Sequence, residues 1–176
     1  AGNDVSKSYD VVYDFGLDGR LDPGDLIDGF SSTDAGLYLV RDLILPGPYL
    51  SQQLDYTGGS FLGQRTYWPA EIASLGLLPL VVISHGNGHD YRWYDYLGQH
   101  LASHGYIVMS HTNNTVPGIE AASTTTLTNT EYFLANLATI ADGDLENHVD
   151  DHKIIWVGHS RGGEGVARAY DRLVDE

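Results

Sequence analysis

The sequence predicts an α/β fold in which a mostly parallel sheet carries flanking helices. Short apolar runs recur from residue 80 onward, and segments with a helical spacing of apolar residues separate them. An apolar run of this length is typical of a parallel strand buried on both faces, and its alternation with helices indicates strand-helix-strand units. With 176 residues, of which 42% are hydrophobic, the chain is long enough to bury one such core.

The segment before Pro69 predicts an antiparallel pair of strands. Residues 37–40 and 43–45 are strand-like, the Pro-Gly-Pro sequence at 46–48 interrupts them, and residues 58–68 alternate toward a further strand. We therefore expect a strand, a turn and a strand at the start of the domain.

The rest of the chain supplies the parallel part of the sheet. The first apolar run is followed by a glycine-rich turn, and the helix after that turn stops near Gly105. The expected elements are a strand at 80–84, a helix over 93–101, a strand at 106–109, a helix at 124–140, a strand at 154–157 and a helix over 166–173.

Composition and charge exclude several classes of function. The chain has 24 acidic and 9 basic residues, so its net charge of -15 repels nucleic-acid backbones and anionic membranes. It has no cysteine, which excludes disulfides, thiolate metal sites and a cysteine nucleophile. No apolar run approaches the roughly 18 residues of a membrane helix. We expect no nucleic-acid partner and no membrane span.

The acidic residues concentrate in a separate region at the start of the chain. Residues 1–36 are predicted to be an acidic loop region with one short strand at 9–13, and residues 37–176 to be the α/β domain. Eight aspartates lie in this first region, interleaved with glycines. They are Asp4, Asp10, Asp14, Asp18, Asp22, Asp25, Asp28 and Asp34.

Segment 14–25 resembles a calcium-binding loop of the EF-hand or dockerin kind. It has aspartates at loop positions 1, 5, 9 and 12 and a glycine at position 6, a spacing that suits Ca²⁺. It departs from that pattern at Gly16, where the loop has an oxygen ligand, and at position 12, where the loop has a longer glutamate. A solvated acidic loop is the alternative interpretation. The candidate ligands are Asp14, Asp18, Asp22 and Asp25.

The strongest chemical signal is a G-x-S-x-G sequence at residues 158–162, placed between an apolar strand and a helix. A sharp strand-to-helix turn of this kind strains the serine backbone and raises its hydroxyl above the sheet at a helix N-terminus. The motif therefore predicts that Ser160 is a nucleophile. The alternative is a glycine-rich turn with an ordinary N-capping serine.

A second turn fits the same chemistry. The sequence His-Gly-Asn-Gly at 85–88 directly follows the strand at 80–84, where this architecture places one main-chain N–H of an oxyanion hole. Glycines at 86 and 88 let the backbone approach a reacting group without an intervening Cβ. Two N–H groups aimed at a developing oxyanion stabilise the transition state by several kcal/mol.

These motifs resemble the α/β-hydrolase superfamily, and are most similar to its bacterial cutinase and polyester-hydrolase branch and to dienelactone-hydrolase-like esterases. The resemblance spans about residues 80–170 and is carried by residues 80–87, 101–108, 112–115 and 158–163. It implies a serine hydrolase that acts on small-molecule or polymeric carboxylic esters through an acyl-enzyme and requires no cofactor or metal. By the same likeness, the main-chain N–H groups of Asn87 and Arg161 form the oxyanion hole around Ser160, and the enzyme is exported, extracellular or periplasmic.

Two residues depart from that family's pattern. Arg161 stands where the polyester hydrolases usually have methionine, and Asn87 stands where their oxyanion turn usually has an aromatic residue. Both side chains are expected to line the cleft, which favours smaller or more polar esters over polyesters.

The triad acid and histidine are not found where this fold places them. Both follow the serine in chain order, but only 16 residues follow Ser160 and all eight histidines precede it. We expect the Asp and His to lie outside this chain, in a second polypeptide or a C-terminal segment, which leaves the fold incomplete at its C-terminal side. His85 or His89, beside the oxyanion turn, is an alternative base. The alternative function is a non-catalytic half-domain that acts as an interaction or structural module.

Overall fold

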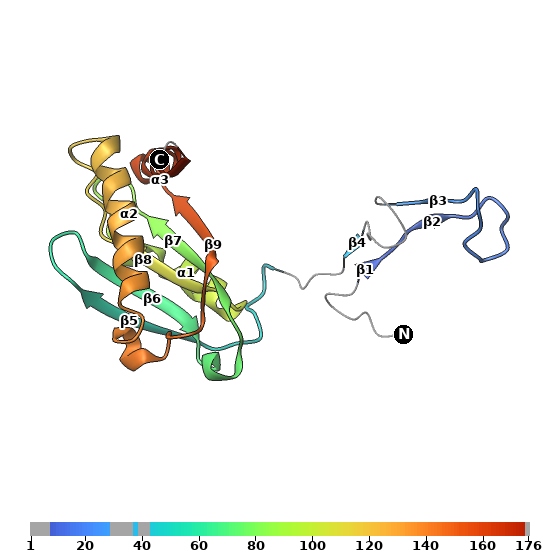
Figure 1. Cartoon of the computed structure of the whole chain (residues 1–176), viewed down its shortest axis with the longest axis horizontal. Helices are drawn as coiled ribbons and strands as arrows, with labels where there is room; N and C mark the ends of the chain where they lie inside the picture. The colour runs from blue at the N-terminus through green and yellow to red at the C-terminus, as the bar shows by residue number, and fades with distance from the viewer. Residues whose placement is uncertain (1–7, 29–36, 39–42, 175–176) are drawn as a thin grey trace. The chain divides into compact units, whose positions relative to one another are not determined.

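The chain divides into two units, Ala1–Leu45 and Pro46–Glu176, in a computed structural model that describes residues 8–28, 37–38 and 43–174. Among the described residues of the smaller unit, four two-residue strands form two antiparallel pairs. They are β1 (Ser8–Tyr9) with β4 (Leu37–Tyr38) and β2 (Val12–Tyr13) with β3 (Leu26–Ile27) (Figure 1). The strand predicted at 9–13 is thus divided between β1 and β2. The predicted domain boundary after residue 36 and the strand-like residues 39–40 lie outside the described residues.

The aspartates of the acidic loop hold its own backbone. The Asp14 carboxylate accepts the main-chain N–H groups of Leu17 and Gly19 at 2.6 and 2.7 Å, and the Asp25 carboxylate accepts that of Asp22 at 2.8 Å. These bonds form local turns of the kind aspartate favours. Within the described residues, no three His, Cys, Asp or Glu side chains are grouped to hold a metal ion. Calcium binding by this loop stays a prediction.

The larger unit contains a five-stranded mixed sheet in the order β5-β6-β8-β7-β9. Its strands are β5 (Ser51–Thr57), β6 (Gly63–Pro69), β7 (Leu78–Ser84), β8 (Ile107–His111) and β9 (Val149–Gly158). The pairs formed by β7 with β8 and with β9 are parallel, while β5, β6 and β8 pair antiparallel (Figure 1). The predicted α/β fold class is confirmed.

The antiparallel pair forms from other residues than the sequence predicts. Residues 43–45 lie in a turn, and the first strand of the pair is β5, which the pattern did not reveal. Nearly all of β5 is exposed because it is the edge strand, so its sequence Ser-Gln-Gln-Leu-Asp-Tyr-Thr carries no apolar alternation.

Helices cover both faces of the sheet. Helix α1 (Asp95–Ser103) packs through Ala102 on the face that carries Val81, and α2 (Ile119–Ala135) packs through Phe133 on the face that carries Val82. Helix α3 (Arg161–Val174) lies beside α2 (Figure 1). Three short 3₁₀ helices complete the unit. They are η1 (Ile72–Ser74), η2 (Tyr91–Tyr94) and η3 (Ile140–Gly143).

The second helix begins and ends earlier than the pattern predicts. It starts after Gly118, whose φ of 134° favours glycine, and it stops at Ala135 rather than near residue 140. Its first turns are rich in Ser and Thr, so they carry little apolar signal. Beyond its end, Ala141 and Asp142 adopt positive φ angles, which no helix continues through.

Within the described residues, β9 is an edge strand with apolar side chains on its surface. Ile155 is 46% exposed, and Tyr170 on α3 is 66% exposed.

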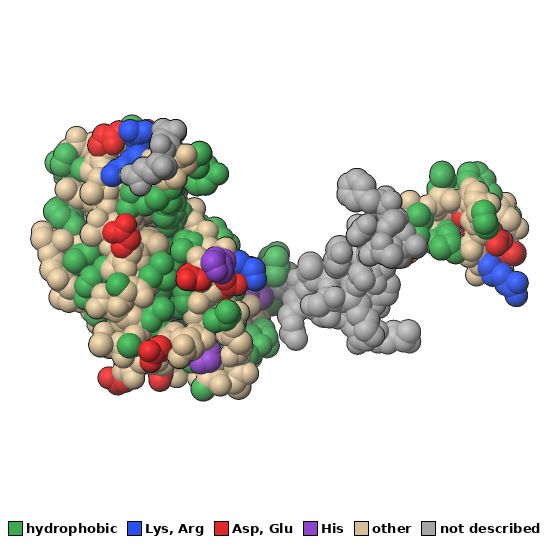
Figure 2. Space-filling view, viewed as in Figure 1, with side chains coloured by type: hydrophobic (Ala, Val, Ile, Leu, Met, Phe, Trp, Pro, Cys, Tyr) green, Lys and Arg blue, Asp and Glu red, His purple; other side chains and the backbone are tan. Residues whose placement is uncertain are grey.

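On the face shown in Figure 2, carboxylates lie in several separate groups among hydrophobic and neutral side chains. None of the described helices has both the length and the apolar character needed to cross a bilayer.

Candidate active site

Three neighbouring strands end together at one edge of the sheet. Ser84 at the end of β7 pairs with His111 at the end of β8 and with Gly158 at the end of β9. The segments that follow these strands therefore emerge side by side at the carboxyl edge, where α/β folds bind ligands. They are the turn at 85–88, the loop at 112–118 and the serine turn at 158–162.

Ser160 lies in the turn between β9 and α3 with a φ of 52°, in the left-handed region that disfavours side chains. The turn is fixed on both sides, because the His159 N–H donates to the Ser84 carbonyl at 3.1 Å and the Gly163 N–H donates to the Ser160 carbonyl at 2.8 Å. Ser160 is exposed above the sheet edge. This is the strained geometry expected of a nucleophile elbow.

Glycines let the serine turn meet the turn at 85–88 and the end of β7. A Cβ on Gly162 would lie 2.1 Å from the Ser84 carbonyl oxygen, and a Cβ on Gly86 would lie 2.9 Å from the Ser160 Cβ. A Cβ on Gly158 would lie 2.4 Å from the Gly162 carbonyl oxygen. No side chain fits at these distances, so the spacing of the motif is what brings Ser160 against the turn at 85–88.

The two residues of the expected oxyanion hole are joined through Thr115. The Thr115 hydroxyl donates to the Asn87 side-chain oxygen at 3.0 Å, and the Arg161 guanidinium donates to the Thr115 carbonyl at 2.9 Å. Thr115 itself is buried. The sequence pattern did not single out this residue, although it belongs to the loop at 112–115 that carries part of the family resemblance.

His85 fixes the direction of the peptide that contains the Asn87 N–H. Its Nε2 accepts the Asn113 N–H at 2.8 Å, so the ring proton is on Nδ1, which donates to the Gly86 carbonyl at 2.8 Å. The Gly86 carbonyl and the Asn87 N–H belong to one planar trans peptide, so holding the first orients the second in the opposite direction. Burial lowers the pKa of His85, which favours this neutral form.

The contacts of His85 and His89 show whether either histidine is positioned to act as the base. Both ring nitrogens of His85 are occupied, and the side chain is buried. His89 stacks on His159 with ring centroids 4.6 Å apart and has its Nδ1 3.2 Å from the Tyr94 hydroxyl. In the part of the chain that the structure describes, no histidine forms a hydrogen bond with the Ser160 hydroxyl.

A further histidine lies inside the sheet behind the site. His111 is fully buried, its Nδ1 donates to the Thr112 carbonyl at 2.9 Å, and its Nε2 accepts from the Ser84 hydroxyl at 2.7 Å. Burial lowers the pKa of His111 to about 4. This pair is therefore a neutral part of the core beneath the site and does not reach a substrate.

An aromatic pocket of about 230 Å³ adjoins the serine turn. It is lined by His89, Trp93, Tyr94, Tyr96 and His159. His159 connects this pocket to Ser160, since it is the preceding residue of the turn. The sequence pattern predicted a helix over 93–101 but did not single out its aromatic residues as part of a site.

Comparison with known proteins agrees with the fold and the motifs. The PET hydrolase-like family matches residues 45–173. Cutinase est1 and cutinase est2 of Thermobifida alba are each 28% identical to the chain over 116 residues, which is 65% of this chain and 37% and 36% of theirs. The chain thus spans little more than a third of the length of these relatives. Because the family match extends over well more than half of the chain, the chain belongs to the PET hydrolase-like family, within the α/β-hydrolase superfamily.

Proposed function

We propose that this chain carries the nucleophile of a serine hydrolase that cleaves carboxylic esters through an acyl-enzyme. The observation that carries the proposal is the backbone of Ser160, which is strained, exposed and held against the turn at 85–88. Strain of this kind is maintained where the surrounding structure fixes a functional side chain. Membership of the PET hydrolase-like family and similarity to two cutinases support the same reaction.

In the proposed reaction, the Ser160 oxygen attacks the ester carbonyl carbon while a base takes its proton. The carbonyl oxygen becomes an oxyanion that accepts hydrogen bonds from the main-chain N–H groups of Asn87 and Arg161. Arg161 is the first residue of α3, so its N–H has no acceptor within the helix. Collapse of the intermediate expels the alcohol with the proton from the base and leaves the acyl group on Ser160. Water then attacks this ester in the same way and releases the acid, and no cofactor is needed.

The base and the acid of the triad are proposed to come from outside this chain. The apolar side chains exposed on β9 and α3, among them Ile155 and Tyr170, form the surface on which further strands of the sheet would pack. A second polypeptide or a following segment that supplies those strands would also supply the histidine and the carboxylate at their ends.

The side chains near the oxyanion hole favour small or polar esters. The guanidinium of Arg161 and the amide of Asn87 both lie at the site and are tied to Thr115. A long apolar acyl chain would desolvate these groups at a cost, whereas an ester that carries hydrogen-bonding groups would not. Polymeric esters remain part of the proposed range, with an extracellular or periplasmic location like that inferred from the sequence.

A fluorophosphonate probe tests the proposal on the native protein, because it reacts only with an activated serine. Intact mass before and after treatment is expected to show an adduct that maps to Ser160, together with polypeptide beyond the 19.2 kDa of this chain. S160A is expected to abolish the adduct, and the control S51A, at an exposed serine on β5, to leave it unchanged.

Two results would contradict the proposal. Labelling of a 19.2 kDa species alone would show that the base lies within this chain. If the native material is not labelled at all, the hypothesis of a non-catalytic interaction or structural half-domain replaces the hypothesis of a serine hydrolase.

A further inference from the structure

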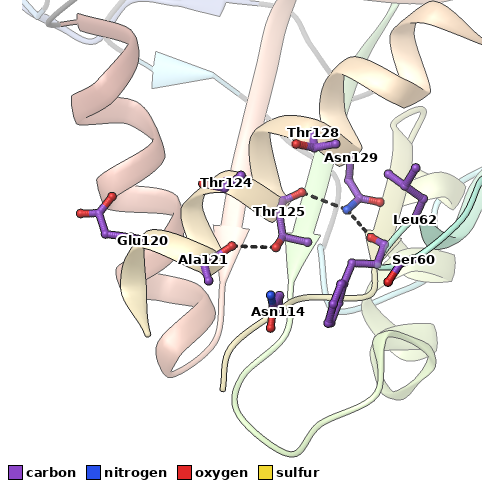
Figure 3. Close-up of a pocket in the computed structure, with 10 residues that line it drawn as sticks. Ser60, Leu62, Asn114, Glu120, Ala121, Thr124, Thr125, Thr128 and Asn129 are labelled. Atoms are coloured by element: carbon purple, nitrogen blue, oxygen red, sulfur yellow. Dashed lines mark hydrogen bonds between the residues drawn. The ribbon is translucent and has the colours of Figure 1, made fainter. Parts of the chain in front are cut away.

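A cavity of about 400 Å³ is lined in part by Asn114 of the loop at 112–118. Its walls come from the turn between β5 and β6, from Asn114 and from the first turns of α2 (Figure 3). This volume falls within the range of about 300–1,000 Å³ that is typical of small-molecule sites. Nothing in the proposed ester chemistry uses these residues.

Asn129 of α2 holds the cavity in shape. Its side-chain nitrogen donates to the carbonyls of Phe61 and Thr125 at 2.8 and 2.9 Å, and its oxygen accepts from the Gln64 amide at 2.7 Å. Asn129 is fully buried, so these bonds are shielded from water. They fix the turn that carries Phe61, whose φ of 57° is unfavourable for an aromatic residue. The cavity is thus preorganised.

The walls present neutral hydrogen-bonding groups beside an apolar ring. Thr124 and Thr128 are exposed on α2, and the Asn114 amide lies opposite them on the loop (Figure 3). The Phe61 side chain is 43% exposed at the same cavity. Hydroxyl and amide groups both donate and accept hydrogen bonds, so they match ligands that do the same.

Glu120, the one charged residue of the lining within the described part of the chain, is neutralised. Glu120 points toward α3 in Figure 3, and its carboxylate accepts from the Arg168 guanidinium at 2.7 Å. Among the residues that the structure describes, no Lys or Arg lines the cavity, and the net charge of -15 repels anions. A wholly apolar ligand would bury the hydroxyls without partners, which costs free energy.

We propose that this cavity binds a saccharide ring, a neutral ligand with hydroxyl groups around its edge and an apolar C–H face. The hydroxyls would bond to Thr128 and Asn114, and the C–H face would pack on the Phe61 ring. This binding does not use Ser160, so it goes beyond the proposed function and does not depend on it.

The cavity is also linked to the candidate active site through one short segment. Asn114 lies between Asn113, which bonds His85, and Thr115, which bonds Asn87. A saccharide bound to Asn114 would therefore contact the same loop whose residues Asn113 and Thr115 bond the turn at 85–88. An ester borne on a saccharide is the kind of substrate that would occupy both places.

The test is a titration of the ¹⁵N-labelled protein with cellobiose and with xylobiose, with benzoate as an anionic aromatic comparison. We expect saccharide-dependent shifts confined to the turn at 58–62, Asn114 and the start of α2, with a Kd of about 1 mM. S160A is expected to bind equally well, which separates this proposal from the catalytic one.

Two variants probe the wall and one serves as a control. F61G removes the ring and suits the left-handed backbone at this position, so it is expected to fold and to weaken binding about tenfold. T128V removes one exposed hydroxyl and is expected to weaken binding several-fold. T139V removes an exposed hydroxyl at a different pocket and is expected to bind as the parent protein does.

The proposal is overturned if neither saccharide shifts these resonances at about 50 mM, well above the expected Kd. It is also overturned if benzoate binds more tightly than both saccharides, or if F61G and T128V bind as well as T139V.

Discussion

At the scale of single residues, the glycine at 162 decides whether the serine turn can form. A Cβ there would meet the Ser84 carbonyl oxygen at 2.1 Å, and that oxygen cannot move away because it belongs to β7, which is paired with a strand on each side. Gly76, by contrast, has open space around its Cβ position. The motif is therefore a packing requirement as well as a chemical one.

The matched pair G162A and G76A tests this requirement. We expect G162A to lower the free energy of unfolding by about 2–3 kcal/mol through overpacking, and G76A to change it by less than about 0.5 kcal/mol. Urea unfolding of the two variants measures the difference. Equal stability of the two would show that the strand ends are not packed as described.

The buried His111 predicts a dependence of stability on pH. Its folded-state pKa of about 4 lies below the ordinary value of 6.5, so the unfolded chain binds more protons between these two pH values. The contribution of His111 to the free energy of unfolding is complete above pH 6.5. It is lost as the pH falls from 6.5 to 4, which lowers the free energy of unfolding by about 3 kcal/mol in all. His85, whose pKa is also lowered, acts in the same direction.

Unfolding free energies measured from pH 7 to pH 4 check this expectation. H111Q is expected to be less stable at pH 7 but to lose less of its stability on acidification than the parent protein. The control H152Q, at an exposed histidine, should keep the parent slope. A slope that is unchanged in H111Q would contradict the assignment of a neutral buried imidazole.

At the scale of elements, the sequence predicts the apolar strands better than the polar one. Strands β7 and β8 are predicted because burial on both faces requires continuous apolar runs, as in Leu-Val-Val-Ile. Strand β9 is predicted from its apolar run at 154–157, although the structure leaves Ile155 on it 46% exposed. Strand β5 is not predicted, because an exposed edge strand can consist of polar residues and then has no apolar pattern. Helix α2 is placed too late because its buried positions include Thr125, Thr126 and Asn129, which hydropathy does not recognise.

The residues of the candidate site also differ in whether the sequence predicts them. Ser160 and the turn at 85–88 are predictable because each lies within a local motif next to a strand. Thr115 and the pair of His85 with Asn113 are not, because their roles come from contacts between segments about 28 residues apart in the chain or further. Side-chain bonds that cross between loops leave no periodicity in the sequence.

At the scale of the whole molecule, we propose that the described domain is the nucleophile-bearing part of a larger active site. It contributes the serine turn, the oxyanion turn and the loop that joins them, and it leaves apolar surface exposed on β9 and α3. The acidic unit before it is compact in its own right and uses its aspartates to hold its own turns. In the proposed reaction, this domain acts by forming an acyl-enzyme on Ser160.

Trapping that intermediate is the most direct test. The native protein is mixed with p-nitrophenyl acetate, quenched in acid after less than one turnover and digested for peptide mapping. We predict an acetyl group on Ser160 that appears with the release of p-nitrophenol and is absent in S160A. Release of p-nitrophenol at the parent rate by S160A, or an acetyl group on a different residue, would contradict the account.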